Sequence, residues 1–177
     1  MIILISGSSH TGKTLLSQRL MERLGIPYLC ADHLKMGLIR SGQTALTPEN
    51  DEELIPYLWS IEKEIVKTAV ENKQSLIIEG CYIPQSWRED FSEEYLTDIR
   101  AVWLIMSEAY IREHFSEIRD NANAIEQRLD DGWLCPEALI ADNMHILEEC
   151  RRHGCQYIPI DGEYSPERLV DRVCELL

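Results

Sequence analysis

The sequence predicts an α/β domain in which a parallel sheet is covered by helices on both faces. Short apolar runs alternate along the chain with segments whose apolar residues recur every three or four positions, as in strands joined by helices. The first run, residues 2–5, is unbroken Ile-Ile-Leu-Ile, which is typical of a central strand buried on both faces. A glycine-rich segment follows and opens the first helical pattern. The length of 177 residues suits one domain, residues 1–177.

Five strands are expected from the apolar runs. The last run contains Pro159, which lacks a backbone N–H and therefore favours a strand at the edge of the sheet. The expected strands span residues 2–5, 28–31, 75–80, 100–106 and 156–160.

The helices are expected to begin at capping residues. Ser107 and Ser165 each precede a helical pattern, and Thr47 followed by Pro48 predicts the start of a long helix that ends near Asn72. In this long helix, the residues expected to face the core are Leu54, Leu58, Ile61, Ile65 and Ala69. Further helices are expected after residue 12, near 34–40, within 85–95 and over 136–153, whereas 119–136 is irregular and charged.

The chain is strongly acidic, with 31 Asp and Glu against 17 Lys and Arg and a net charge of −14. Nucleic-acid-binding proteins usually carry a basic surface, so no nucleic-acid partner is expected. The same charge disfavours docking on an anionic membrane, and no apolar run approaches the length of a membrane span. No signal peptide is visible, so a cytoplasmic location is expected. The sequence leaves the oligomeric state open.

Six cysteines occur, and none belongs to a C-x-x-C pair. A domain of this size in a reducing compartment does not need disulfides, so free thiols are expected. Cys150, His153 and Cys155 lie close in sequence, but their spacing matches no strong zinc pattern.

A phosphate-binding loop (P-loop) follows the first strand. Its G-x-x-x-x-G-K-[ST] pattern lies between an apolar strand and an amphipathic helix, the context in which the pattern binds nucleotides. The glycines let backbone N–H groups point at phosphate oxygens, and the helix adds the positive end of its dipole. The residues expected to bind the nucleotide are Gly7, Ser8, Ser9, His10, Thr11, Gly12, Lys13, Thr14 and Leu15.

Two residues of the loop have more specific expected roles. Lys13 reaches the β- and γ-phosphates and acts in catalysis, and Thr14 offers a hydroxyl to Mg²⁺. The imidazole of His10 is expected to be incidental rather than catalytic.

Two acidic residues follow strands that should end beside this loop. Glu79 ends an apolar strand, where it can hold Mg²⁺ or face a substrate, or can be a surface carboxylate. Asp32 ends the second strand and should face the same crevice, because ligands of open α/β sheets lie outside the carboxyl ends of the strands. Asp32 can accept a proton from an acceptor hydroxyl, orient that hydroxyl, or cap the helix near Leu34.

Five arginines are candidates for anionic groups. Arg40 and Arg88 can bind an acidic group on the acceptor, or can be solvated or paired surface residues. Arg112 and Arg119 are seven residues apart and share a helix face, and Arg128 follows in the irregular segment. At least one of these last three is expected to stabilise charge on a transferring phosphoryl group.

This layout resembles the nucleoside-monophosphate-kinase-like branch of P-loop kinases. The strand end at 76–80, followed by Cys-Tyr-Ile-Pro at 81–84, is similar to that of 2-phosphoglycerate-kinase-like proteins. Asp32 resembles the acceptor-side aspartate of shikimate, gluconate and zeta-toxin-type kinases. Arg128-Leu129-Asp130-Asp131 resembles the R-x-D-D of the adenylate kinase lid. A second lid arginine follows about three turns later in adenylate kinase, and this chain has Leu139 there, which disfavours a nucleoside-monophosphate acceptor.

The resemblance implies the three-layer P-loop NTPase fold with strand order 2-3-1-4-5, ATP as phosphate donor, and a closing lid at about 108–135. Substrate-binding helices are expected at about 34–72. The sequence therefore predicts an ATP- and Mg²⁺-dependent kinase of a small-molecule acceptor. The alternatives are a non-catalytic ATP-binding regulator and a GTPase-type switch, although N-K-x-D is absent and no D-x-x-G follows the third strand. The identity of the acceptor is left open.

Overall fold

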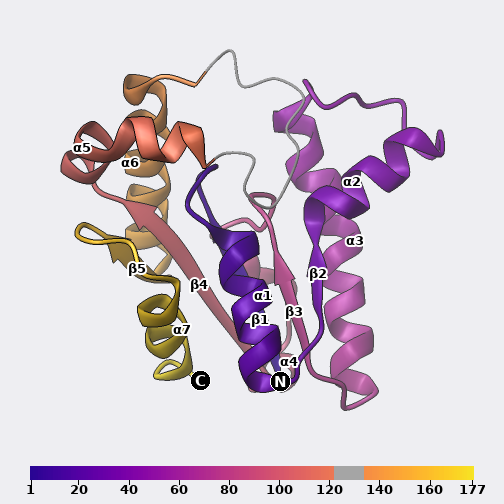
Figure 1. Cartoon of the computed structure of the whole chain (residues 1–177). Coiled ribbons are helices and arrows are strands. Elements are labelled where there is room, and N and C mark those ends of the chain that lie inside the picture. Colours follow the sequence, from indigo (N-terminus) through magenta and orange to yellow (C-terminus); the bar gives the residue numbers. More distant parts are fainter. Residues whose placement is uncertain (122–133) are drawn as a thin grey trace.

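The structure is a computed structural model that describes residues 1–121 and 134–177, and it contains a five-stranded parallel sheet between helices (Figure 1). The strand order is β2-β3-β1-β4-β5, so the predicted α/β class and order are confirmed. The strands are β1 (Ile2–Gly7), β2 (Tyr28–Cys30), β3 (Leu76–Glu79), β4 (Ile99–Met106) and β5 (Gln156–Ile160). The helices are α1 (Lys13–Leu24), α2 (Ala31–Arg40), α3 (Asp51–Glu71), the 3-10 helix η1 (Trp87–Asp90), α4 (Glu93–Leu96), α5 (Glu108–Asp120), α6 (Pro136–His153) and α7 (Pro166–Cys174).

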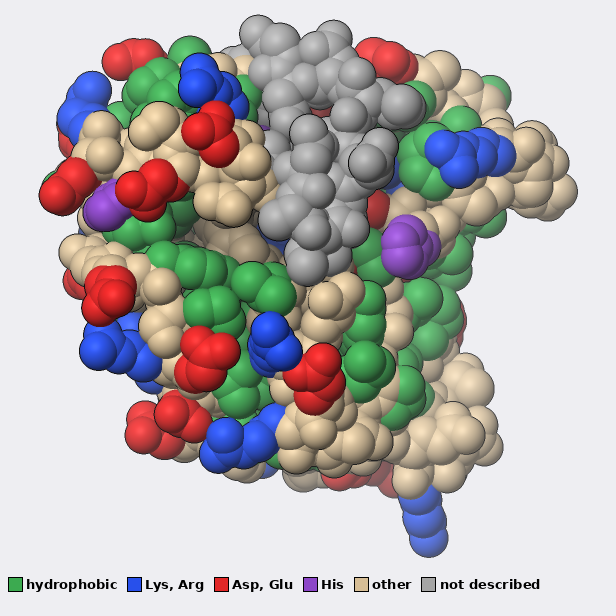
Figure 2. All heavy atoms as spheres, in the orientation of Figure 1, with side chains coloured by type: hydrophobic (Ala, Val, Ile, Leu, Met, Phe, Trp, Pro, Cys, Tyr) green, Lys and Arg blue, Asp and Glu red, His purple; other side chains and the backbone are tan. Residues whose placement is uncertain are grey.

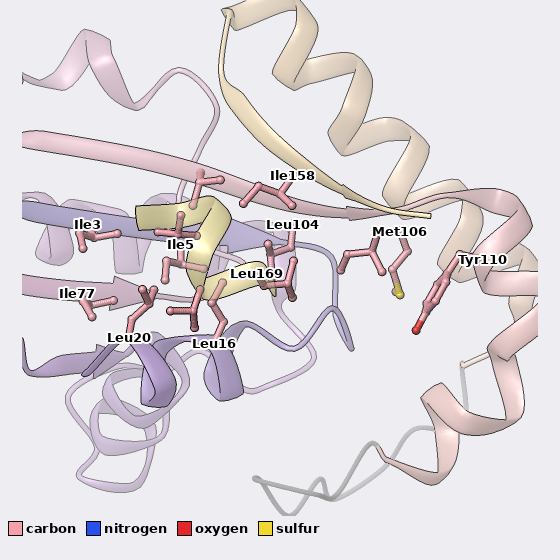
Figure 3. Packing of buried hydrophobic residues seen from close by; sticks show 14 of the residues in the cluster. Ile3, Ile5, Leu16, Leu20, Ile77, Leu104, Met106, Tyr110, Ile158 and Leu169 are labelled. Carbon is pink, nitrogen blue, oxygen red and sulfur yellow. The ribbon is translucent and has the colours of Figure 1, made fainter. Parts of the chain in front are cut away.

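Helices α1 and α7 cover one face of the sheet. Leu16, Leu20 and Leu169 pack there against Ile3 and Ile5 of the central strand (Figure 3). All five side chains are almost fully buried, and burying each contributes about 1.5–3 kcal/mol.

Helices α3 and α6 cover the opposite face. Val66 of α3 and Cys150 of α6 belong to the same cluster as Ile2 and Leu4 of β1, whose side chains alternate with those of Ile3 and Ile5. The central strand is thus buried on both faces, as its unbroken apolar sequence predicted.

Several predicted helix boundaries and the edge strand are confirmed. The hydroxyl of Ser107 accepts a hydrogen bond from Tyr110 N at 3.1 Å, and that of Ser165 accepts one from Arg168 N at 3.3 Å. Pro159 lies in β5, which is at the edge of the sheet.

The start of the long helix was predicted wrongly. Thr47 does not cap it, because the backbone N–H and hydroxyl of Thr47 donate to Asn50 Oδ1 at 2.8 and 3.0 Å in a turn. Asn50 instead precedes α3, which begins at Asp51.

The core-facing side of α3 also differs from the prediction. Ile61 and Ile65 are only half-buried, and Glu62 and Val66 occupy the buried positions one residue further along. The shift places a carboxyl group inside the domain.

The helix predicted within 85–95 is replaced by the short elements η1 and α4. Trp87 and Phe91 are buried at this point with ring centroids 6.1 Å apart in an edge-to-face arrangement, and this packing interrupts the helix. Helix α2 begins at Ala31, three residues earlier than expected, so Asp32 lies in its first turn.

Part of the expected lid, 108–135, is α5, while residues 122–133 lie outside the described residues. In the described part of the chain, no helix is both long and apolar enough to cross a membrane. Figure 2 shows Lys and Arg side chains spread singly among Asp and Glu on one face of the molecule.

We expect the close packing of α2 against β3 to be sensitive to a single methyl group. A Cβ atom at Gly80 would lie 2.4 Å from the Cβ atom of Ala31, so Gly80→Ala should lower the free energy of unfolding by about 1–3 kcal/mol. Gly37→Ala is the control, because nothing lies within 4 Å of a Cβ atom there and alanine favours helix by about 0.5–1 kcal/mol. Urea denaturation followed by circular dichroism measures both, and a Gly80→Ala protein as stable as the Gly37→Ala protein would contradict this packing.

Candidate active site

The backbone of the loop between β1 and α1 adopts conformations that favour glycine. Gly7 has φ 137°, and a Cβ atom there would lie 2.3 Å from the carbonyl oxygen of Leu104. Gly12 has φ 83° and precedes α1, and a Cβ atom there would lie 1.9 Å from Tyr164 Oη. His10 also has a positive φ, 65°. A loop of this kind at a helix N-terminus is suited to bind phosphate through its N–H groups.

The side chain of Lys13 folds back over this loop. Its Nζ donates to the carbonyl oxygen of Ser8 at 2.7 Å, and the Thr11 hydroxyl donates to the same oxygen at 2.9 Å. Lys13 is only 9% exposed. The ammonium group is therefore already held at the phosphate-binding loop.

Thr14 and Glu79 meet because of the strand register. Ile5 of β1 pairs with Glu79 of β3, and Gly80 N donates to Ile5 O at 3.1 Å. The Thr14 hydroxyl, in the first turn of α1, donates to Glu79 Oε1 at 3.1 Å. Glu79 is 2% exposed, so it is not a surface carboxylate. A hydroxyl and a carboxylate are the hard oxygen donors that Mg²⁺ prefers, and the pair fits a magnesium ion that also binds nucleotide phosphates.

Asp32 lies beside this pair, because Cys30, the last residue of β2, is paired with Glu79. Asp32 is not the N-cap of α2, because Cys30 is the residue that precedes this helix. Asp32 Oδ1 lies 2.6 Å from Lys35 Nζ, and that ammonium donates to Tyr82 Oη at 2.7 Å. Sequence reasoning missed Lys35, although its position one turn after Asp32 on a helix could have indicated the pair.

Glu62 is a second residue that sequence reasoning missed. It is fully buried on α3, and no hydrogen-bond donor among the described residues reaches either carboxyl oxygen. Burial, and then the negative charges of Asp32 and Glu79, raise the pKa of Glu62 from 4.5 to about 7.

Two residues from the C-terminal half contact the loop. The Ser8 hydroxyl donates to Asp142 Oδ2 of α6 at 2.5 Å. Tyr164, from the segment between β5 and α7, packs beside Gly12, and burial raises its pKa to about 12. No sequence pattern indicated these contacts, because the residues are far apart along the chain.

The four candidate arginines within residues 1–121 are all exposed. Arg40 ends α2 at an exposed position about 12 Å along the helix axis from Asp32. Arg88 lies over the Trp87 ring at 5.1 Å. It also lines a surface pocket with residues that begin β4 and β5, at the amino ends of the strands and away from the loop. Arg112 and Arg119 are exposed on α5, and Arg128 lies outside the described residues.

The arginines of α5 are each held by neighbouring acids. Arg112 Nε lies 2.9 Å from Glu108 Oε1, and a second nitrogen lies 3.6 Å from Glu137 of α6. Arg119 pairs with the adjacent Asp120 at 3.3 Å. Helix α5 follows the carboxyl end of β4, so the helix that carries both arginines begins at the same end of the sheet as the loop.

The remaining predicted residues complete the loop. Ser9 is half-buried within it, and Leu15 is half-buried in the first turn of α1. All six cysteines lie in the described ranges and are free thiols, as expected. Within residues 1–121 and 134–177, no three His, Cys, Asp or Glu side chains gather closely enough to bind a metal by themselves.

The same fold occurs in proteins of known structure. Solved structures of P-loop small-molecule kinases are similar to this chain over nearly its whole length, and the resemblance drawn from the sequence is confirmed at the level of the fold. The chain matches no protein-family model and no curated protein sequence.

Three solved structures illustrate the likeness. A deoxyadenosine kinase from M. mycoides has a TM-score of 0.62 at 14% identity, over 99% of this chain and 97% of that one. A shikimate kinase from Bacteroides thetaiotaomicron has a TM-score of 0.60 at 15% identity, with the same coverage. A gluconokinase from Sinorhizobium meliloti 1021 has a TM-score of 0.55 at 17% identity, over 96% of this chain and 86% of that one.

The raised pKa of Glu62 predicts a pH-dependent stability. The folded protein binds the Glu62 proton more tightly than the unfolded chain, so this stabilisation is complete below pH 4.5 and is lost as the pH rises to about 7. The loss amounts to about 3 kcal/mol, because each pH unit between the two pKa values of Glu62 corresponds to about 1.4 kcal/mol. Glu62→Gln does not titrate, so its free energy of unfolding should rise relative to the wild type between pH 5 and pH 8. Urea denaturation at each pH measures the difference, and a constant difference would contradict the shift.

Proposed function

We propose that this protein is an ATP- and Mg²⁺-dependent kinase that transfers the γ-phosphoryl group of ATP to a small-molecule acceptor. The observation that carries the proposal is the strand register, which brings Thr14, Glu79 and Asp32 together at the carboxyl edge of the sheet beside Lys13. One side of this arrangement suits the phosphates, and the other suits an acceptor hydroxyl.

On the donor side, the loop N–H groups and the α1 N-terminus hold the phosphates. Lys13 moves from the Ser8 carbonyl to phosphate oxygens and stabilises negative charge as the phosphoryl group transfers. Thr14 and Glu79 would hold a magnesium ion, which would neutralise charge on the phosphates.

On the acceptor side, Asp32 accepts a hydrogen bond from the hydroxyl that attacks the phosphorus, and it receives the proton or orients the group. Lys35 fixes one oxygen of Asp32 at 2.6 Å and so restricts the carboxylate to one orientation. Helices α2 and α3, which overlap the expected range 34–72, would enclose the acceptor. The lid at 108–135 and a catalytic role for Arg112, Arg119 or Arg128 stay predictions.

The fold supports this function over the alternatives. Solved structures with the same fold include kinases of shikimate, gluconate and deoxyadenosine by name. Lys13, Thr14, Glu79 and Asp32 are all present, and Lys13 and Thr14 bind Ser8 and Glu79, which a degenerate ATP-binding regulator would not require.

We expect Lys13→Ala to abolish phosphate transfer, because no other ammonium in the described residues is hydrogen-bonded to the loop carbonyl of Ser8. A coupled ADP-release assay with Mg-ATP and a panel of hydroxylated metabolites measures it. Lys67→Ala, which removes a surface pair with Glu64 on α3, is the control and should leave activity unchanged. Acceptor-independent or absent ADP release in the wild type, despite tight ATP binding, would favour the regulator.

Asp32→Asn should lower kcat by about 10²–10³, because it removes a group that acts in the transition state. Its affinity for Mg-ATP, measured by isothermal titration calorimetry, should not change. Asp171→Asn, which changes an exposed carboxylate on α7 that pairs with Arg23, is the control. Unchanged turnover in Asp32→Asn would remove Asp32 from the mechanism while leaving the kinase assignment in place.

A further inference from the structure

Glu62 occupies a position where an apolar residue would stabilise the fold better. It lies on α3 between Leu58 and Val66, one helical turn away in each direction, and all three side chains are 0% exposed. Both carboxyl oxygens of Glu62 lack a hydrogen-bond donor among the described residues. Buried carboxyl groups are normally hydrogen-bonded, so this one requires an explanation.

The surroundings of Glu62 show which part of the molecule it faces. The two charges that act on it are those of Asp32 and Glu79, which lie at the carboxyl ends of β2 and β3. Leu58, one turn before Glu62 on α3, packs in one cluster with Ala31 and Tyr82. Ala31 directly precedes Asp32, and Tyr82 follows soon after Glu79 in the sequence. Glu62 therefore lies near the residues proposed for the acceptor side of the site.

The charge of this region is negative. Asp32, Glu62 and Glu79 contribute three carboxyl groups, against two ammonium groups: that of Lys13, which binds the Ser8 carbonyl, and that of Lys35, which Asp32 and Tyr82 bind. Arg40 and Arg88, the arginines expected for an acidic acceptor, lie at the far end of α2 and at the opposite edge of the sheet. An acceptor with a carboxylate or phosphate would be repelled, whereas a hydroxyl or ammonium group would supply the donor that Glu62 lacks.

We propose that Glu62 is a specificity-determining residue that binds a hydroxyl or ammonium group of the acceptor, and that the acceptor is an uncharged or cationic molecule without an acidic group. Nucleosides and amino sugars have this chemistry, and sugar acids and nucleotides do not. The inference rests on the proposed kinase function and names the substrate class of that same site.

Two matched pairs of probes test the charge preference on the full chain saturated with Mg-ADP. Glucosamine is paired with gluconate, and deoxyadenosine with deoxyadenosine monophosphate, and calorimetry measures each affinity. We expect the uncharged or cationic member of at least one pair to bind at least 10-fold more tightly than its acidic partner. A hydrogen bond to a charged group accounts for a factor of about 10–100.

Glu62→Gln and Glu62→Leu test the residue itself. Each should weaken binding of the preferred probe by about 10-fold or more and leave the affinity for Mg-ADP unchanged. Retained Mg-ADP binding also shows that the variants are folded. Glu64→Gln is the matched control, because Glu64 is on the same helix but exposed and paired with Lys67.

Three results would overturn the inference. They are tighter binding of the acidic probes, equal probe affinities in the wild type and both Glu62 variants, and no probe binding by a protein that binds Mg-ADP. A carboxyl group with a purely structural role gives the second result. Failure of the wild type to bind Mg-ATP, or retained activity in Lys13→Ala, would instead overturn the proposed function, so the two failures are distinguishable.

Discussion

The site depends on the register between β3 and the strands on either side of it. Glu79 is paired with Ile5 of β1 and with Cys30 of β2, so one residue lies beside both the phosphate-binding loop and the start of α2. Side chains alternate along a strand, and a shift of one residue would turn Glu79 away from Thr14. The chemistry at this edge therefore requires the correct pairing of buried backbone, which the apolar packing on both faces stabilises.

Residues beyond the strands fix the loop by close contact. Leu104 of β4 and Tyr164 after β5 leave no room for a side chain at Gly7 and Gly12, and Asp142 of α6 binds the Ser8 hydroxyl. The loop is thus contacted by residues of β4, of α6 and of the segment after β5, in addition to its connections to β1 and α1. A rigid loop presents its N–H groups to phosphate without first reorganising, which is the form of electrostatic stabilisation that favours transfer.

The sequence predicted what depends on local pattern. Strands, several caps, the loop, Glu79 at the end of β3 and Asp32 just after β2 follow from short stretches whose meaning does not depend on distant residues. The contacts of Asp142 and Tyr164 depend on how α6 and the end of β5 pack, which short stretches do not encode. Arg88 was assigned from its place after the third strand, but the packing of Trp87 and Phe91 carries that segment toward the opposite edge of the sheet.

The buried face of α3 was predicted wrongly, because short sequence patterns do not decide between two faces of this helix. The helix is apolar at Ile61 and Ile65 as well as at Val66, so periodicity alone fits two faces, and a preference for apolar residues excludes the face that contains Glu62. Burial of Leu58 and Val66 contributes about 1.5–3 kcal/mol each, whereas an unsatisfied buried polar group costs about 1–3 kcal/mol. Burial of Leu58 and Val66 can therefore hold α3 in this orientation despite the cost of burying Glu62. An acidic residue on this apolar face is more readily explained by function than by folding.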